Sequence, residues 1–270
     1  MSSINTNVGA GIGLQNLSKT QTNLDTTTRH ISTGKRVSTP QEQASIFAIA
    51  QGLQSDLQAF DAVGQSLSSA TGAAAVATAG ATAVSDLLTN LKAQAIEASN
   101  PANTPGQQSI LSAGFNATLN QIGTIVQNAT YNGVNLLSSG SQSVSVTSTI
   151  SGGQLTISNA SGVGGVTTAL AGGVATTAAA ISLLSAIDAQ QLVVGSSLGS
   201  LGSSLQSIDS QSNFQQVLSN ATATGLGSLV DANLPAEAAR LQALNVQQQL
   251  GSQTLSIANQ RPQVLLGLFR

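Results

Sequence analysis

The stretch that decides the fold runs from Ile46 to Ala98 and reads IFAIAQGLQSDLQAFDAVGQSLSSATGAAAVATAGATAVSDLLTNLKAQAIEA. Its apolar side chains recur at alternating spacings of three and four residues, the pattern of a helix that buries one seam against partner helices. Two interleaved series of period seven, broken only at Asp56, make up this seam: Ile46, Leu53, Phe60, Leu67, Ala74, Ala81, Leu88 and Ala95, and Ile49, Val63, Ala70, Ala77, Val84, Leu91 and Ala98. We therefore predict one helix from Gln41 to Ser99, which is long enough to need equally long partners.

Helix-start signals precede the first two predicted bundle helices. The segment Thr39-Pro40-Gln41-Glu42 combines a capping threonine, a proline suited to the first helical position and a glutamate placed for a capping box. Thr104 followed by Gln107 repeats the capping pattern after two prolines. A second, antiparallel helix is therefore predicted to follow and to end near Asn128.

The middle of the chain has the character of turns and short strands. Asn132-Gly133 predicts a tight hairpin turn. The alternation in residues 144–150, continued beyond Gly152-Gly153, predicts a second small β-hairpin. Residues 158–177 fit either a contact region or a flexible Ser/Gly linker. No charged side chain occurs from 98 to 187, so we expect this interval to pack against neighbours or to carry O-glycosylated hydroxyl groups.

Helical spacing returns in the last third of the chain, where a third bundle helix is predicted through Leu184, Leu198 and Leu205. A Gly/Ser/Asn-rich break is predicted from Asn220 to Asn233, and Pro235 starts a last amphipathic helix. The predicted fold class is mainly α, with a long antiparallel helical bundle, a terminal two-helix coiled coil and a small β-hairpin region in the middle. The predicted segments are an N-terminal coiled coil (1–40), bundle helices with a hairpin (41–137), an outer β/loop region (138–180), a returning bundle helix (181–225) and a C-terminal coiled coil (226–270).

Composition argues against catalysis and against nucleic-acid binding. Charged residues make up 7% of the chain, and the net charge of -2 comes without any dense basic patch that would neutralise a phosphate backbone. There is no cysteine, and the single histidine, His30, is expected in solvent or at an interface, without a carboxylate cluster beside it. Asp56 and Asp61 do not share a helix face. We therefore predict no enzyme activity, no cofactor and no metal site.

Neither a signal peptide nor a membrane span is predicted. Residues 1–17 lack the basic and apolar regions of a cleaved secretory signal. Uncharged runs such as 62–85 consist largely of Ala, Thr, Gly and Ser, which give a weak transfer energy into a bilayer. These runs are interpreted as buried helix interior.

Several separated motifs resemble bacterial flagellins. SINTN at residues 3–7, LQNL at 14–17 and ISTGKRV at 31–37 are similar to the N-terminal region of that family. TYNGVNLL at 130–137 resembles the hairpin after its second helix, and ANQRPQVLLGLFR at 258–270 resembles its C-terminus. The GLFR ending resembles flagellins of alphaproteobacteria more than those of enteric bacteria.

The resemblance implies a subunit of the extracellular flagellar filament, used in swimming and exported by the flagellar secretion system. The implied partners are further copies of the chain, the export apparatus and its chaperone, and the cap and hook-junction proteins. In that family the two chain ends pair in the filament core, and we expect this role for Ile4, Val8, Leu17, Leu24, Ile31, Leu241, Leu244, Leu255, Leu265, Leu268, Phe269 and Arg270. The expected bundle seam comprises Ile46, Leu53, Phe60, Leu67, Leu88, Leu91, Leu184, Leu198 and Leu205.

Two departures from the family pattern carry expectations of their own. Flagellins sensed by the animal Toll-like receptor carry arginine, arginine and glutamate where this chain has Asn90, Lys92 and Ala93, so weak or absent receptor recognition is expected. The middle region is short, which implies a thin, smooth filament.

Two alternatives to a filament subunit stay open. A hook-filament junction protein has similar ends and would adapt the filament base without forming long polymers. A flagellin-like surface adhesin would use the Ser/Thr-rich middle to bind a ligand in a concave pocket.

Overall fold

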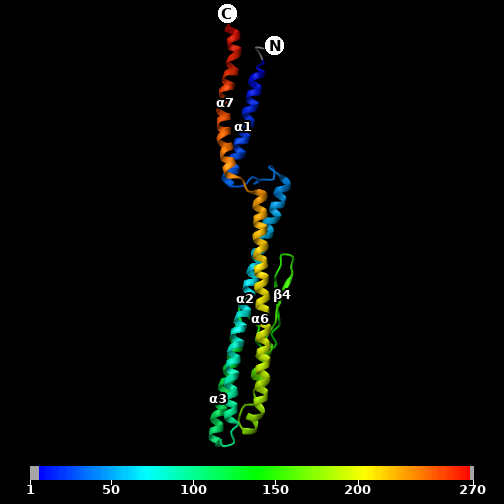
Figure 1. Ribbon diagram of the computed structural model, residues 1–270, viewed down its shortest axis with the longest axis vertical. Coiled ribbons are helices and arrows are strands. Elements are labelled where there is room, and N and C mark those ends of the chain that lie inside the picture. Colours follow the sequence, from blue (N-terminus) through cyan, green and yellow to red (C-terminus); the bar gives the residue numbers. More distant parts are fainter. Residues whose placement is uncertain (1–5, 268–270) are drawn as a thin grey trace. The chain divides into compact units, whose positions relative to one another are not determined.

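The computed structural model describes the backbone of residues 6–267 and the side chains of residues 6–260. Its order of elements confirms the predicted mainly helical fold class (Figure 1). The helices are α1 (Val8–Thr33), α2 (Ala44–Ala98), α3 (Pro105–Asn128), α4 (Ser161–Gly164), α5 (Val166–Ala169), α6 (Thr177–Val230) and α7 (Leu234–Gly267). The strands are β1 (Thr130–Tyr131), β2 (Val134–Asn135), β3 (Val144–Thr147) and β4 (Gln154–Ile157).

The chain forms two compact units. The first contains the residues up to Leu57 and those from Asn220 onward, so it joins both ends of the chain. The second runs from Gln58 to Ser219. Helices α2 and α6 each contribute residues to both units.

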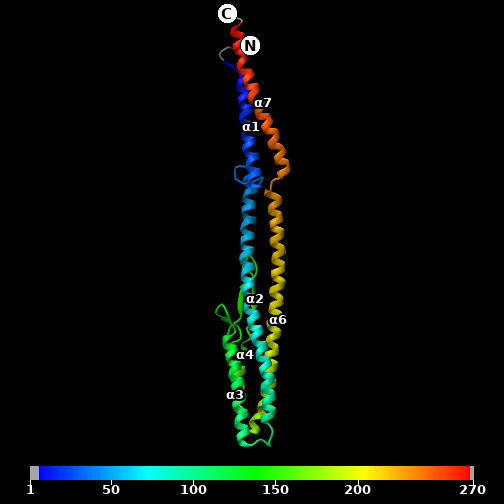
Figure 2. The ribbon, with the colours of Figure 1, turned by 90° about the vertical axis from the view of Figure 1, so that its left-hand side faces the viewer.

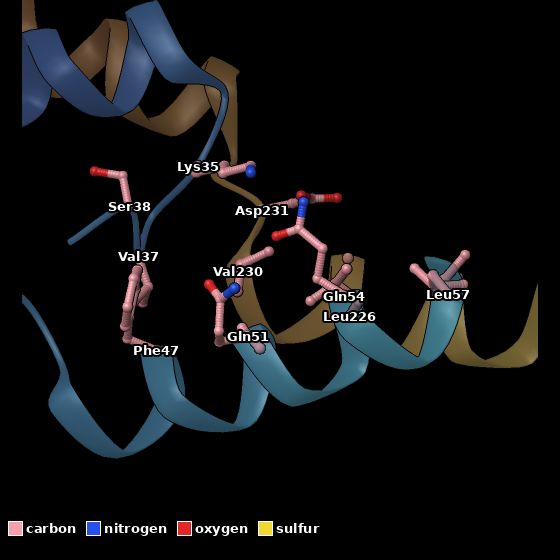
Figure 3. Close-up of a pocket in the computed structure, with 13 residues that line it drawn as sticks. Lys35, Val37, Ser38, Phe47, Gln51, Gln54, Leu57, Leu226, Val230 and Asp231 are labelled. Carbon is pink, nitrogen blue, oxygen red and sulfur yellow. The ribbon is translucent and has the colours of Figure 1, made fainter. Parts of the chain in front are cut away.

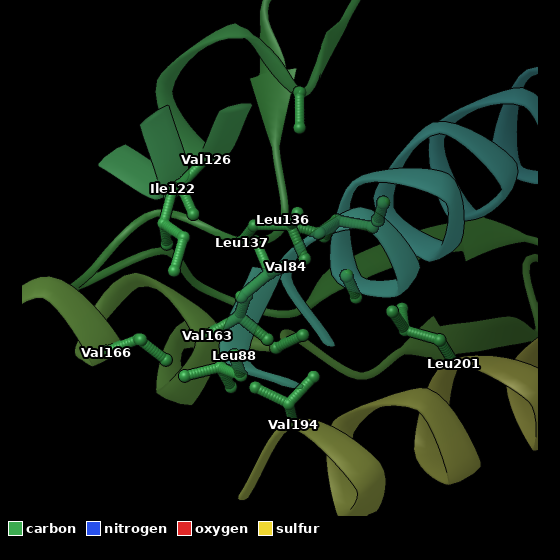
Figure 4. Close-up of a cluster of buried hydrophobic side chains, with 14 of the residues drawn as sticks. Val84, Leu88, Ile122, Val126, Leu136, Leu137, Val163, Val166, Val194 and Leu201 are labelled. Atoms are coloured by element: carbon green, nitrogen blue, oxygen red, sulfur yellow. The ribbon is translucent and has the colours of Figure 1, made fainter. Parts of the chain in front are cut away.

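In the second unit, the seam of α2 is buried without interruption. Every seam position from Phe60 to Ala98 is at most 9% exposed. The same core contains Phe115 and Ile122 of α3, together with side chains of α6 that are buried at intervals of seven residues, namely Ala180, Ile187, Val194, Leu201 and Ile208. Figure 4 shows Leu88 of this seam near Val163 and Val194. Each buried leucine or isoleucine contributes about 1.5–3 kcal/mol, so this seam is a major source of stability for the unit.

Helix α2 begins at Ala44, three residues later than the prediction of Gln41. Oε2 of Glu42 accepts hydrogen bonds from the backbone N–H groups of Ser38 at 2.7 Å and Thr39 at 3.1 Å. The backbone N–H of Glu42 donates to the carbonyl of Thr39 at 3.2 Å, which closes a turn. Glu42 therefore caps a turn that precedes the helix. The predicted helix start was wrong because a capping glutamate makes the same hydrogen bonds to backbone N–H groups in an isolated turn as at the start of a helix.

Local signals for α3 and the first hairpin are confirmed. Thr104 Oγ1 accepts from the N–H of Gln107 at 3.3 Å, and the Gln107 side chain accepts from the N–H of Thr104 at 2.8 Å, which completes a capping box. Strands β1 and β2 pair antiparallel across Asn132 and Gly133, with φ angles of 48° and 79°. Positive φ at both positions is the geometry that an Asn-Gly hairpin turn requires.

The rest of the middle region is partly as predicted. Strands β3 and β4 form the expected second hairpin, with Val144 opposite Ile157. The flexible linker considered for residues 158–177 is wrong, because this segment contains α4 and α5. Four of its side chains are completely buried in the core of the second unit, and they are Val163, Val166, Leu170 and Val174. Apolar burial of this extent outweighs the Ser/Gly composition that suggested a linker.

Helix α6 continues through most of the predicted break at 220–233 and ends at Val230. Polar residues that favour loops are accommodated within the helix, because the hydroxyl of Thr224 donates to the carbonyl of Asn220 at 2.8 Å. Leu226 and Val230 also bury apolar surface against Val37 and Ala50 in the first unit. The break is therefore confined to residues 231–233.

Helices α2 and α6 are long and apolar enough to cross a membrane by length and composition alone. Core helices of soluble proteins pass the same test, so this criterion does not separate the two cases. In α2 the seam side chains from Val63 to Ala98 are covered by the core of the second unit, whereas Ile96 outside the seam is 55% exposed.

Candidate assembly interface

The first and last helices of the chain lie side by side and antiparallel (Figures 1 and 2). Three polar contacts mark their register. The Asn7 side chain donates to the carbonyl of Ala258 at 2.8 Å, and the Gln248 side chain donates to Gln21 Oε1 at 2.7 Å. His30 meets Glu237 at the opposite end of α1, as described below. The pairing therefore extends along the described length of α1.

The contact face of this pair follows the coiled-coil spacing in both helices. In α1, solvent exposure drops at Ala10, Gly13, Leu17, Thr20, Leu24, Thr27 and Ile31. In α7, it drops at Glu237, Leu241, Leu244, Gln248, Gly251, Leu255 and Ala258. Alternating steps of three and four residues place each set on one face. Several members are polar or lack a side chain, so this seam buries less apolar surface per turn than the seam of α2.

Two glycines in this face receive leucines from the opposite helix. An ideal Cβ on Gly13 would lie 3.3 Å from Leu255 Cδ1, and one on Gly251 would lie 3.3 Å from Leu17 Cδ1. Both glycines thus allow a close approach, at the cost of about 1 kcal/mol of intrinsic helix stability each. The paired helices therefore gain packing contacts at the same positions where glycine lowers the helix propensity of each helix alone.

The residues expected in the filament core fall into four groups. Leu17, Leu24, Ile31, Leu241, Leu244 and Leu255 lie on the face shared by α1 and α7. Val8 is 68% exposed and does not lie on that face. The backbone of Leu265 belongs to α7, but its side chain lies outside the described side chains. Ile4, Leu268, Phe269 and Arg270 lie outside the described residues.

Apart from Val8, the exposed apolar side chains of these helices were not singled out from the sequence. Those that are more than half exposed are Val8, Ile12 and Leu14 of α1 and Val246, Leu250 and Ile257 of α7. Helical spacing places Val8 and Ile12 opposite the seam of α1, and the three side chains of α7 opposite the seam of α7, so they lie on outward faces of the pair. Apolar side chains exposed on outward faces are available for contact with another protein. The signal in the sequence was present, because the apolar positions of α1 and α7 exceed those needed for one seam.

The segment after α1 is fixed to the end of α6. Gly34 adopts a left-handed φ of 69°, and its carbonyl accepts from the N–H of Ala232 at 2.9 Å. Arg36 donates through its backbone to Val230 at 2.6 Å and through its guanidinium to Leu229 at 2.7 Å. These bonds hold the chain entry to α2 and the chain exit from α6 together.

A hollow of about 240 Å³ lies beside this junction (Figure 3). Its wall is a mixture of apolar and polar side chains, with Phe47, Leu57 and Leu226 among the apolar ones. Lys35 and Asp231, which pair through an isolated β-bridge, supply charges of opposite sign to the same lining. The lining residues, all from the described part of the chain, include no arrangement of nucleophile and base that would suggest catalysis.

The expectation that His30 has no carboxylate beside it is wrong. The His30 side chain is 10% exposed and lies between two glutamates. Its Nδ1 is 3.2 Å from Glu237 Oε1, and its Nε2 is 3.6 Å from Glu42 Oε1. Arg29 also reaches Glu42 Oε1, at 3.4 Å. Glu237 is far from His30 in sequence, so only the antiparallel pairing of α1 and α7 brings these groups together.

The charge of Glu42 is stabilised by its surroundings. Burial acts to raise the pKa of Glu42, but hydrogen bonds from the backbone N–H groups of Ser38 and Thr39 oppose this effect and leave the pKa below its ordinary value. The Ser38 hydroxyl and the proximity of His30 act in the same direction as these hydrogen bonds. Glu42 is therefore a fixed anion at neutral pH.

The expected bundle seam is placed as follows. Phe60, Leu67, Leu88 and Leu91 are buried in the core of the second unit. Leu184, Leu198 and Leu205 are partly buried against that core, and Ile46 and Leu53 are half-buried in the first unit. Ile49, also in the seven-residue series, is 54% exposed, because Phe47 and Ala50 take the inward positions at this end of α2.

The residues of the receptor region lie on α2. Asn90 and Ala93 are exposed. Lys92 is half-buried, and its ammonium group forms an ion pair with Asp188 of α6. Lys92, the only cationic side chain among these three residues, is thus already paired within the same chain.

The observed features define a class: a mainly α-helical protein whose two ends pair and fold into one unit. Comparisons with known proteins identify the family. Residues 4–143 match the bacterial flagellin N-terminal helical region, and residues 180–269 match the bacterial flagellin C-terminal helical region. The chain belongs to the bacterial flagellin family, whose members are structural subunits of the extracellular flagellar filament.

Full-length relatives come from alphaproteobacteria. Flagellin FljK of Caulobacter vibrioides is 34% identical, over 100% of this chain and 99% of the relative. The flagellin of Brucella melitensis is 32% identical, over 100% of both chains. The crystal structure of Bacillus cereus flagellin is similar over 54% of this chain and 86% of that chain, with a TM-score of 0.49 and 17% sequence identity.

Proposed function

We propose that the chain polymerises with its α1–α7 pair in the core of the filament and drives swimming as part of that polymer. The observation that carries this placement is the set of exposed apolar side chains on the outward faces of the pair, which includes Val8 and Ile12 of α1 and Leu250 of α7. Contacts between copies would remove these side chains from water, at about 25 cal/mol per Å² of apolar area. The placement also assigns residues 1–40 and 226–270 to the filament core, 41–137 and 181–225 to the inner bundle, and 138–180 to the outer surface.

The weak seam of the α1–α7 pair supports folding that is coupled to assembly. Thr20, Thr27 and Gln248 lie in a seam that a stable isolated coiled coil would fill with apolar side chains. Packing against other copies would stabilise the pair by mass action, because the assembled state binds only the folded helices. This argument supports a core that becomes fully stable in the polymer.

Further partners follow from membership of the flagellin family. We propose export through the flagellar secretion system with its chaperone, and contact with the filament cap and the hook-junction proteins. The short middle region, with hairpin β3–β4 and helices α4 and α5, supports a thin and smooth filament surface. Weak or absent Toll-like receptor recognition is proposed from Asn90 and Ala93, together with the engagement of Lys92 by Asp188.

Growth from filament seeds tests the assignment. Purified monomer is added to short seeds, and filament length is measured by electron microscopy. Wild-type protein is expected to give long continuous filaments, whereas Leu250→Asp is expected to abolish growth, because it would place a charge among the exposed apolar side chains of α7. Gln249→Asp is the matched control, since it adds the same charge at a neighbouring exposed position.

Two other outcomes would favour the alternatives. Seeds that stay short with blocked ends would indicate a hook-filament junction protein. Seeds that neither grow nor become blocked, together with a saturable ligand of the middle region, would indicate an adhesin. Equal growth of Leu250→Asp and wild-type protein would contradict the proposed core placement.

A further inference from the structure

His30 stands at the place where three segments of the first unit meet. It lies near the end of α1, faces Glu42 of the segment before α2, and faces Glu237 in the first turn of α7. Its side chain is 10% exposed, and those of Glu42 and Glu237 are 13% and 14% exposed. Groups buried to this extent interact more strongly than the same groups in water.

The two ring nitrogens of His30 are not equally satisfied. Nδ1 lies within hydrogen-bond distance of Glu237 Oε1, at 3.2 Å. Within the described part of the chain, Nε2 has no hydrogen-bond partner, and neither has the nearest carboxylate oxygen, Glu42 Oε1. These two buried atoms face each other at 3.6 Å. An ionised carboxylate only accepts hydrogen bonds, and a neutral imidazole has a single N–H. Neutral His30 can therefore donate a hydrogen bond to only one glutamate at a time.

Groups other than His30 favour a negative charge at each of the two glutamate positions. Backbone N–H groups of Ser38 and Thr39 bind Glu42 Oε2. Glu237 lies in the first turn of α7, where the helix dipole favours a negative charge. A second proton on His30 would thus meet a carboxylate that is already charged and oriented, and it would form a charge-assisted hydrogen bond.

The other charged groups near this site are accounted for. Arg29 of α1 contacts Glu42 Oε1 at 3.4 Å and competes with His30 for that oxygen. Arg36 donates to Leu229 and Gln43, and Lys35 pairs with Asp231 through a β-bridge. Among the described residues, Glu42 and Glu237 are the only ones that form an ion pair with His30.

We propose that protonation of His30 joins α1 to both Glu42 and Glu237, so that the junction between the terminal helices and α2 is more stable in mildly acidic than in mildly alkaline solution. The proposal rests on the proposed placement of α1 and α7 in the filament core and adds proton control of that element. Its sign follows from the contacts. The protonated ring makes two charge-assisted bonds in the folded unit and the neutral ring makes one, so stability is lost when a rise in pH removes the second proton from the ring.

Hydrogen exchange of the full-length chain tests this proposal at pH 5.5 and pH 8. Protection factors, which correct for the intrinsic pH dependence of exchange, are measured for peptides that contain His30 or Glu237. Wild-type protection is expected to fall roughly tenfold between the two pH values, as expected for the loss of one charge-assisted hydrogen bond of about 1.4 kcal/mol. His30→Gln and Glu42→Gln are expected to abolish this difference, because each removes one side of the Nε2–Oε1 contact.

Arg29→Gln is the matched control. It removes a charge next to Glu42 and leaves the imidazole and both of its glutamates in place, so the tenfold difference is expected to remain. Equal protection of wild-type protein at both pH values, or an undiminished difference in His30→Gln, would overturn the proposal. The same would hold if the wild-type peptides had no protection at either pH. Seed growth is measured separately on these samples, so a protein that fails to polymerise yet retains the tenfold difference contradicts the filament-core placement alone.

Discussion

Leu17 of α1 packs against the backbone of Gly251 in α7, with its Cδ1 3.3 Å from the place where a Cβ would stand. The reciprocal contact, Leu255 over Gly13, has the same geometry. Glycine at these positions fixes the register of the two helices, because a leucine can seat fully only where the facing residue has no side chain. The α1–α7 pair is thus specified by shape as well as by apolar character.

Gly251→Val is expected to destabilise this pair. The added side chain must displace Leu17, and overpacking of this kind costs about 1–3 kcal/mol. The measurement is the temperature at which seeded filaments depolymerise, which should fall for Gly251→Val. Gly11→Ala is the control, since no atom lies within 4 Å of its ideal Cβ and alanine should instead stabilise α1 by about 1 kcal/mol. A variant Gly251→Val with unchanged depolymerisation would show that Leu17 does not seat there.

Gly164→Ala is expected to destabilise the second unit. An ideal Cβ on Gly164 would lie 2.6 Å from the carbonyl oxygen of Leu137 and 2.8 Å from the carbonyl carbon of Ser138, and neither backbone atom can move freely. The expected loss is about 2–3 kcal/mol in the free energy of unfolding, measured by urea denaturation. Gly114→Ala in α3, where the Cβ has open space, should stabilise by about 1 kcal/mol. Equal stability of the two variants would refute the close approach at Gly164.

Leu88→Ala is expected to cost about 2–5 kcal/mol, because Leu88 is completely buried in the seam of α2 and truncation leaves a cavity. The exposed neighbour Asn90 provides the comparison, and Asn90→Ala should change stability by less than about 0.5 kcal/mol. Thermal unfolding measures both. A small effect at Leu88 would mean that the core of the second unit closes around the missing side chain.

Acid is expected to loosen the segment that precedes α2. Because the folded structure lowers the pKa of Glu42 below its ordinary value of 4.5, the anion stabilises the folded state at pH values above 4.5, and this stabilisation is lost as the pH falls below that value. Hydrogen exchange of the Ser38 and Thr39 amides, compared at pH 5.5 and pH 3.5, measures the loss. Glu42→Gln should remove the acid dependence of these amides, and its persistence in that variant would assign it to another carboxylate.

Receptor recognition is expected to be restored by charge at three positions of α2. The triple variant Asn90→Arg, Lys92→Arg and Ala93→Glu supplies the residues that recognised flagellins carry, and the arginine introduced in place of Lys92 would still be able to pair with Asp188. A Toll-like receptor reporter cell should respond weakly to the wild-type protein and more strongly to the triple variant. A strong wild-type response would contradict the expectation, and circular dichroism checks that the variant retains its helices.

The amino-acid sequence alone determined the elements whose physics is local. The Thr104–Gln107 capping box and the Asn132–Gly133 turn form as predicted, because each depends on side chains within four residues of one another. The buried seam of α2 from Phe60 to Ala98 was predicted equally well, because an apolar repeat of seven residues places these side chains on a single face of the helix.

Only the tertiary structure decided the features that depend on distant contacts. Helix α6 passes through Asn220 because Leu226 and Val230 pack against apolar residues 37 and 50. These contacts join residues far apart in the sequence, so local helix propensity could not predict them. Residues 158–177 fold because Val163 and its neighbours enter a core supplied by other helices. His30 meets Glu42 and Glu237 because α1 and α7 pair antiparallel, and Glu237 is 207 residues away in the chain. Local hydrogen bonds and hydrophobic periodicity depend on residues close together in the sequence, so the sequence predicts them. Burial and ion pairing depend on which surfaces the folded chain brings together.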